Sequence, residues 1–266
     1  MTRRRPLWES VLFSLIRLSP IIAPATILPI FSYDQTAIDL LVKRWLVLLA
    51  VLVFWNMTEG GAILWMKAKT HASPNARGFL LVTMLCGAAT VAILQYGRTL
   101  SSQGSFLLVL AILSIRGMSR SGWEHNRPLA GFLGAIVGNS LITLVSLLCI
   151  APSLDWQSIA VAVAIGSSVG AVEASWYSTT FSREALTRWA LPLFRSTLCL
   201  GPITIATMGM TNQIPLPYAL TSLALPLATR HLRQANTLNE IPSSTLRGAA
   251  GIYLLFLAIM MGCKVL

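Results

Sequence analysis

Long apolar stretches follow one another along this chain, and most of its basic residues fall in alternate gaps between them. A helix needs about 20 residues to cross about 30 Å of hydrocarbon, and most of the stretches are near that length. The pattern predicts an all-α, multi-pass membrane protein with about nine transmembrane helices. The stretches lie near residues 11–31, 45–65, 78–96, 104–118, 129–151, 157–177, 189–210, 214–229 and 246–263.

The charges in the gaps predict the orientation of the chain in the membrane. Basic residues gather before the first stretch and after the second, fourth, sixth and eighth. The other gaps hold few basic residues and all three aspartates, Asp34, Asp39 and Asp155. Because cytoplasmic loops carry an excess of lysine and arginine, we expect the N-terminus in the cytoplasm and the C-terminus on the far side. The predicted cytoplasmic gaps are also the longer ones, so we expect functional residues there.

The composition agrees with a single transmembrane domain over residues 1–266. Hydrophobic residues make up 55% of the sequence and charged residues 11%, and the mean hydropathy is +0.70, so the chain lacks the polar surface of a soluble protein. The net charge of +11 is spread over short loops that would face anionic lipid, and no loop is long enough for a nucleic-acid-binding module. We therefore expect a lipid bilayer and no nucleic acid as partner, in a bacterial inner membrane or its organellar equivalent.

The cysteines and histidines predict no metal or redox site. All four cysteines fall within or at the end of apolar stretches without the close pairing of a zinc or redox motif, which favours a packing role. The three histidines, His71, His125 and His231, fall in three different predicted cytoplasmic loops. Metal binding would require these loops to converge, so we interpret the histidines as solvated.

Four ionisable residues lie inside the apolar stretches as clear cases, apart from arginines near the ends of stretches. Each costs several kcal/mol in hydrocarbon unless it is paired or reaches water. The predicted orientation places all four in the cytoplasmic halves of their helices, which favours a shared polar cavity that opens to the cytoplasm. The alternative is that they form buried salt bridges that only hold helices together. The four residues are Arg17, Glu59, Glu173 and Arg195.

Polar neighbours extend this candidate ligand-binding site. Asn56 lies three residues before Glu59 and shares its helix face, and Tyr177 lies four residues after Glu173. Such groups on two helices could hold a cation or a charged head group. Five further residues near the cytoplasmic ends of the fourth and sixth stretches complete the candidate set: Ser178, Ser182, Arg116, Arg120 and Arg127.

The layout resembles that of the intramembrane aromatic prenyltransferases, the UbiA-type superfamily. The members of that family are similar in having nine transmembrane helices, a cytoplasmic N-terminus and functional cytoplasmic loops after helices two and six. The sequence GWEHNRPLAGFLGAIVGN at 122–139 looks like the entry to their fifth helix. The segment from Leu225 to Gly262 looks like the end of the dihydroxynaphthoate prenyltransferase branch, in which an Asn-containing loop precedes the last helix.

The family's two aspartate-rich motifs, on helices two and six, hold magnesium against a prenyl diphosphate. The matching regions here read FWNMTEGGAILWMKAKT and VEASWYSTTFSREALTR, and neither contains an aspartate. Because a two-magnesium site requires several carboxylates, the resemblance implies a divergent relative that binds an isoprenoid, quinone or pigment tail without transferring it. It also implies a possible role as a subunit of a larger membrane complex. No cofactor is expected, and magnesium only if the chain is catalytic.

Two alternatives remain open at this stage. The chain could be an active prenyltransferase with an altered metal site. It could also be a small proton- or cation-coupled transporter in which Glu59 and Glu173 bind the coupling ion. Such transporters often have broken helices at corresponding positions in two halves, whereas Pro20, Pro24 and Pro29 crowd into the first stretch without a matching set.

Overall fold

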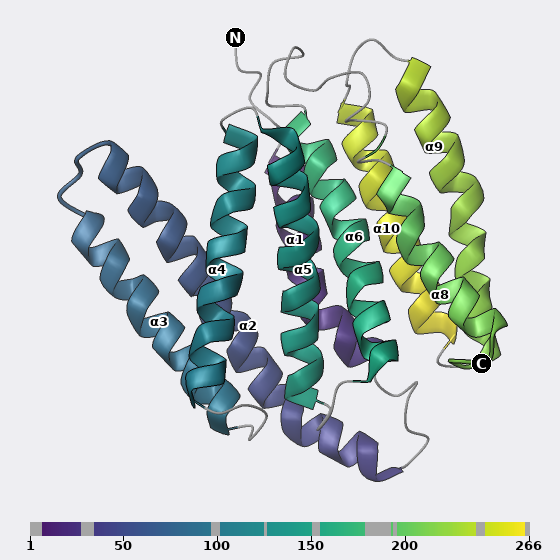
Figure 1. Cartoon of the computed structure of the whole chain (residues 1–266), viewed down its shortest axis with the longest axis horizontal. Coiled ribbons are helices and arrows are strands. Elements are labelled where there is room, and N and C mark those ends of the chain that lie inside the picture. Colours follow the sequence, from purple (N-terminus) through teal and green to yellow (C-terminus); the bar gives the residue numbers. More distant parts are fainter. Residues whose placement is uncertain are drawn as a thin grey trace. The chain divides into compact units, whose positions relative to one another are not determined.

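The computed structural model describes residues 7–27, 35–96, 102–124, 127–150, 155–178, 193, 196–237 and 243–263. In these residues every regular element is a helix (Figure 1). The elements are α1 (Leu7–Ile27), α2 (Gln35–Thr70), α3 (Ala76–Tyr96), α4 (Ser102–Glu124), α5 (Pro128–Ile150), α6 (Trp156–Ser178), the 3-10 helix η2 (Thr197–Cys199), α8 (Leu200–Met210), the 3-10 helix η3 (Leu216–Ala224), α9 (Leu225–Thr237) and α10 (Ser243–Cys263).

Six of the described helical segments are long and apolar enough to cross a membrane. Two shorter apolar segments, Val11–Ala23 and Thr197–Met210, accompany them. The prediction of an all-α, multi-pass membrane protein is therefore confirmed at this level. The six segments are Val47–Thr70, Ala76–Tyr96, Gln103–Trp123, Pro128–Leu148, Trp156–Tyr177 and Leu246–Cys263.

The chain forms two compact units, which we describe separately. The first contains Met1–Tyr33, Ile115–Leu147 and Ser153–Leu266, and the second contains Asp34–Ser114 and Leu148–Pro152. The division passes through α4, so the first residues of that helix belong to the second unit and its last ten belong to the first.

The second unit is built around a hairpin of α2 and α3. The backbone N–H of Ser73 donates to the carbonyl of Ala68 at 2.8 Å and closes the turn, in which Ala72 has a φ of 50°. Gly61 lets the two helices approach, because a Cβ there would lie 2.7 Å from the Thr83 hydroxyl. Small residues at such crossings are typical of helix packing in membranes.

The helix α2 is longer than the apolar stretch that predicted it. The stretch was placed at 45–65, whereas the helix runs from Gln35 to Thr70. No glycine or proline occurs between Gln35 and Glu59, so nothing in the backbone stops the helix where charged residues begin. The apolar candidate span within it still begins at Val47.

The helix α6 lies in the core of the first unit. Its residues Val161–Glu173 are mostly buried, and small residues dominate the buried positions. At Gly166 an added Cβ would clash with the Ser140 side chain and backbone of α5, so this glycine sets how closely α5 and α6 pack. Gly201 of α8 lies in the same way against Ser168 of α6.

The segment predicted as the eighth crossing, 214–229, contains two helices of different kinds. A 3-10 helix, η3, ends at Ala224, and α9 follows it directly. Pro215, Pro217 and Pro226 lack the backbone N–H that a continuous α-helix would need across this segment. Because α9 then continues to Thr237, the basic residues Arg230 and Arg233 lie on a helix, whereas the sequence had placed them in a loop.

Candidate functional site

A buried carboxylate on α6 is the centre of the charged cluster in the first unit. Glu173 is 3% exposed. Its Oε1 lies 3.1 Å from Nη1 of Arg116 on α4 and 3.6 Å from Nε of Arg17 on α1. A buried charge is tolerated only when it is paired and hydrogen-bonded, and two guanidinium groups meet that need here.

An amide on α5 completes the cluster. Asn139 accepts a hydrogen bond at Oδ1 from Nη1 of Arg116, at 2.8 Å. Its Nδ2 donates to the carbonyl of Ala135 at 2.8 Å and to Oε1 of Glu173 at 3.3 Å. The cluster therefore joins α1, α4, α5 and α6 through the single oxygen Oε1 of Glu173. The contacts of Glu173 described above, all with described residues, are made by Oε1 and not by Oε2.

Gly138 provides the space through which Arg116 reaches its partners. A Cβ at position 138 would lie 2.9 Å from Cδ of Arg116. The sequence analysis grouped Arg116 and Arg120 with the basic residues that follow the fourth stretch, and that grouping is wrong because both lie on α4, which continues to Glu124. Arg116 is buried inside the bundle instead.

Aromatic side chains form a layer beside the charged cluster. Phe13 of α1 stacks on Trp176 of α6 with the ring centroids 4.2 Å apart and the planes nearly parallel. Tyr177 stacks on Trp123 of α4 at 5.4 Å and meets the Phe13 ring edge-on at 6.3 Å. The guanidinium of Arg17 lies 5.9 Å from the centroid of the Phe13 ring. Charge and aromatic surface thus lie within about one turn of α6 of each other.

The structure brings together three of the predicted site residues, Arg17, Arg116 and Glu173, with Tyr177 beside them. Sequence reasoning missed Asn139 and the three other aromatic residues. A lone asparagine inside an apolar helix needs a partner, and that signal would have identified Asn139. Phe13, Trp123 and Trp176 carry no comparable signal, because aromatic residues are common at the ends of membrane helices.

The remaining predicted residues are spread over other places. Asn56 and Glu59 lie on α2 in the second unit, where the Asn56 amide donates to the carbonyl of Leu52 at 2.7 Å. Arg127 is exposed between α4 and α5, and its backbone N–H donates to the carbonyl of Gly122. Ser178 is the last residue of α6, and its side chain, like Ser182 and Arg195, lies outside the described residues. Among the described residues, no group of three or more His, Cys, Asp or Glu could hold a metal ion.

Comparison of the chain with protein-family models, with curated proteins and with solved structures found no match. Function is therefore argued from the geometry of the first unit. This geometry comprises fixed polar groups and stacked aromatic side chains within an apolar bundle.

Proposed function

We propose that this chain is a UbiA-like membrane protein of about nine helices that binds an isoprenoid- or quinone-like molecule and does not transfer a prenyl group. The observation that carries the proposal is the aromatic layer of Phe13, Trp123, Trp176 and Tyr177 against the cluster at Glu173. A quinone ring requires a stacking surface and hydrogen-bonding groups, and its tail requires an apolar groove. The N-terminus is proposed to be cytoplasmic, in a bacterial inner membrane or its organellar equivalent.

The charges at Glu173 argue against prenyl transfer and against cation transport at this residue. A magnesium ion or a coupling cation requires carboxylate oxygens that are not already neutralised. Arg116 and Arg17 lie 3.1 and 3.6 Å from Oε1 of Glu173, and their positive charges would repel a cation there. A role as a subunit of a larger membrane complex is also part of the proposal.

The proposal is tested with the purified chain in detergent. Native mass spectrometry would identify co-purified molecules, and calorimetric titration with a short-chain isoprenoid quinone would measure affinity. We expect saturable binding that Tyr177→Leu weakens by about fivefold, since an aromatic contact of this kind contributes about 1 kcal/mol beyond its buried area. Tyr96→Leu is the matched control, because Tyr96 is 85% exposed at the end of α3 in the second unit.

Two results would overturn the proposal. The first is an equal effect of the two tyrosine variants, or no quinone or isoprenoid binding at all. The second is magnesium-dependent release of diphosphate from a prenyl diphosphate that is lost in Glu59→Gln or Glu173→Gln. The second result would make the chain a prenyltransferase with an altered metal site.

A further inference from the structure

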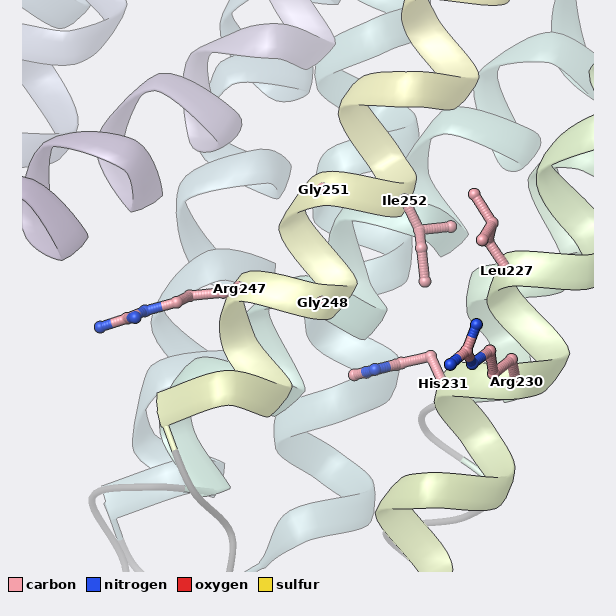
Figure 2. Close-up of a pocket in the computed structure, with 7 residues that line it drawn as sticks. All are labelled: Leu227, Arg230, His231, Arg247, Gly248, Gly251 and Ile252. Carbon is pink, nitrogen blue, oxygen red and sulfur yellow. The ribbon is translucent and has the colours of Figure 1, made fainter.

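A pocket of about 340 Å³ opens to the surface between α9 and α10 (Figure 2). It lies in the first unit but involves none of the residues of the cluster at Glu173. Two arginines and a histidine contribute to its lining, and none of the described lining residues is acidic. The lining residues are Leu227, Arg230 and His231 of α9 and Arg247, Gly248, Gly251 and Ile252 of α10.

His231 is fixed in the wall of this pocket. The sequence suggested a solvated loop histidine, and that interpretation is wrong because His231 lies on α9 and is only 9% exposed. Its imidazole fits against the backbone of α10 because residue 248 is glycine. A Cβ at Gly248 would lie 2.5 Å from both Cε1 and Nδ1 of the ring. Figure 2 shows the ring of His231 directed toward Gly248, with Arg230 beside it on the same helix.

The two arginines of the lining differ in direction. Figure 2 shows Arg247 extending from α10 away from Arg230 and His231. Its guanidinium lies over the ring of Trp8, 4.5 Å from the ring centroid. The polar groups that converge on the pocket are therefore the side chains of Arg230 and His231, and Leu227 and Ile252 form an apolar wall next to them.

We propose that this pocket binds a phosphate group, with Arg230 and His231 as donors. A guanidinium presents several N–H donors in a planar fork that matches phosphate oxygens. At Gly251 an added Cβ would have nothing within 4 Å, so this glycine leaves the α10 wall of the pocket open to the close approach of a ligand. The apolar wall of Leu227 and Ile252 would accommodate the first carbons of an attached chain. The proposal does not depend on quinone binding at the other cluster.

The phosphate could come from a lipid head group or from free phosphate, and two arms of one experiment distinguish these sources. The intact chain would be placed in phosphatidylcholine nanodiscs. One arm adds inorganic phosphate, and the other includes phosphatidic acid in the disc. Affinity is read from lipid adducts in native mass spectrometry and from the shift in the midpoint of thermal unfolding. Binding in the second arm alone assigns the site to a lipid, and binding in both arms assigns it to phosphate itself.

The variants compare two arginines on the same helix. Arg230→Gln removes one charge from the pocket and should weaken binding by about tenfold, the loss expected for a charge-assisted hydrogen bond. Arg233→Gln removes the same charge from an exposed residue of α9 outside the lining and should leave the affinity within about twofold. Gly248→Ala should weaken binding by displacing the imidazole, with the melting midpoint recorded as a check on folding.

Three results would overturn the proposal. One is equal weakening by Arg230→Gln and Arg233→Gln, which would indicate only the general attraction of a basic surface. Another is the absence of binding in both arms. The third is a folded Gly248→Ala variant that binds as well as the unchanged chain.

Discussion

At the scale of single residues, the buried cluster depends on a glycine, Gly138, which has no side chain to block Arg116. Arg116 reaches Asn139 and Glu173 over Gly138, where even a methyl group would lie 2.9 Å from the Arg116 Cδ. The three polar groups then bond to one another inside an apolar bundle. Removal of any one of them would leave the others with charge or hydrogen-bonding capacity that hydrocarbon does not satisfy.

The pairing at Glu173 gives a prediction about stability. Glu173→Gln should lower the free energy of unfolding by about 3–5 kcal/mol, because it leaves the buried guanidinium of Arg116 and the partly buried one of Arg17 without their carboxylate. Adding Arg116→Met to this variant should restore part of the loss, because it removes one of the uncompensated charges. Thermal unfolding in detergent of the single and double variants forms a double-mutant cycle that measures the coupling.

The outcome also separates the two interpretations of Glu173. Loss of stability that the second change partly restores would mark the residue as a structural link among α1, α4, α5 and α6. Unchanged stability of Glu173→Gln together with loss of a co-purified molecule would contradict the pairing and mark a residue that faces a ligand.

The sequence allowed part of this cluster to be predicted. Glu173 and Arg17 stand out because ionisable residues are costly inside apolar stretches, and both interpretations of their charges followed from that cost alone. Arg116 was grouped with the gap after the fourth stretch because basic residues near the end of an apolar stretch were counted with the gap, whereas α4 continues past them to Glu124. The partner of a buried charge depends on how the helices pack against one another. The spacing of residues along a single helix does not reveal which other helix supplies that partner.

At the scale of whole elements, α1 shows how a proline is accommodated within an apolar helix. Pro20 has no N–H, so the carbonyl of Ile16 loses its usual helical donor. The hydroxyl of Ser19 donates to that carbonyl at 2.5 Å. Since its one hydrogen is used there, the Ser19 oxygen accepts from the hydroxyl of Tyr253 on α10, at 2.6 Å. The Ser19 hydroxyl thus satisfies the carbonyl that Pro20 leaves without a donor, and it also links α1 to α10.

This arrangement predicts that the cost of Ser19→Ala depends on Pro20. In the unchanged chain, Ser19→Ala should destabilise by about 1–3 kcal/mol, because it leaves the Ile16 carbonyl and the Tyr253 hydroxyl unsatisfied. In a Pro20→Ala background the restored N–H should satisfy the carbonyl, so the same change should cost about 1 kcal/mol less. Chemical unfolding of the four chains measures the difference. Equal costs in both backgrounds would show that the serine does not repair the helix.

The element boundaries were harder to predict than the elements. The helices α3, α5 and α6 lie close to their predicted stretches, because an apolar run of membrane length has few other structures available to it. The segment at 214–229 departs from its prediction because three prolines interrupt the backbone in an otherwise apolar run. Hydropathy depends only on how apolar the side chains are, so it does not reveal where the backbone lacks N–H donors. The positions of the prolines determine that here.

At the scale of the whole molecule, the orientation in the membrane is the prediction with the widest consequences. It places the proposed sites on the cytoplasmic side, and it rests on the sorting of basic residues among the gaps. The turn at 71–75 should face the cytoplasm, and the turn at 211–215 should face the far side. Four long candidate spans lie between these turns, so they face opposite sides only if the shorter apolar segment at Thr197–Met210 also belongs to a crossing.

Cysteine labelling tests the orientation and that fifth crossing together. In a chain with its four native cysteines replaced by alanine, Asn75→Cys and Gln213→Cys would each place a thiol in one exposed turn. An impermeant maleimide added to intact cells should label position 213 and not position 75, and permeabilised cells should show labelling of both. The reverse pattern would invert the orientation and move the sites to the outer face. Labelling of both positions, or of neither, in intact cells would mean that the chain crosses the membrane an even number of times between them. The segment Thr197–Met210 would then not cross the membrane.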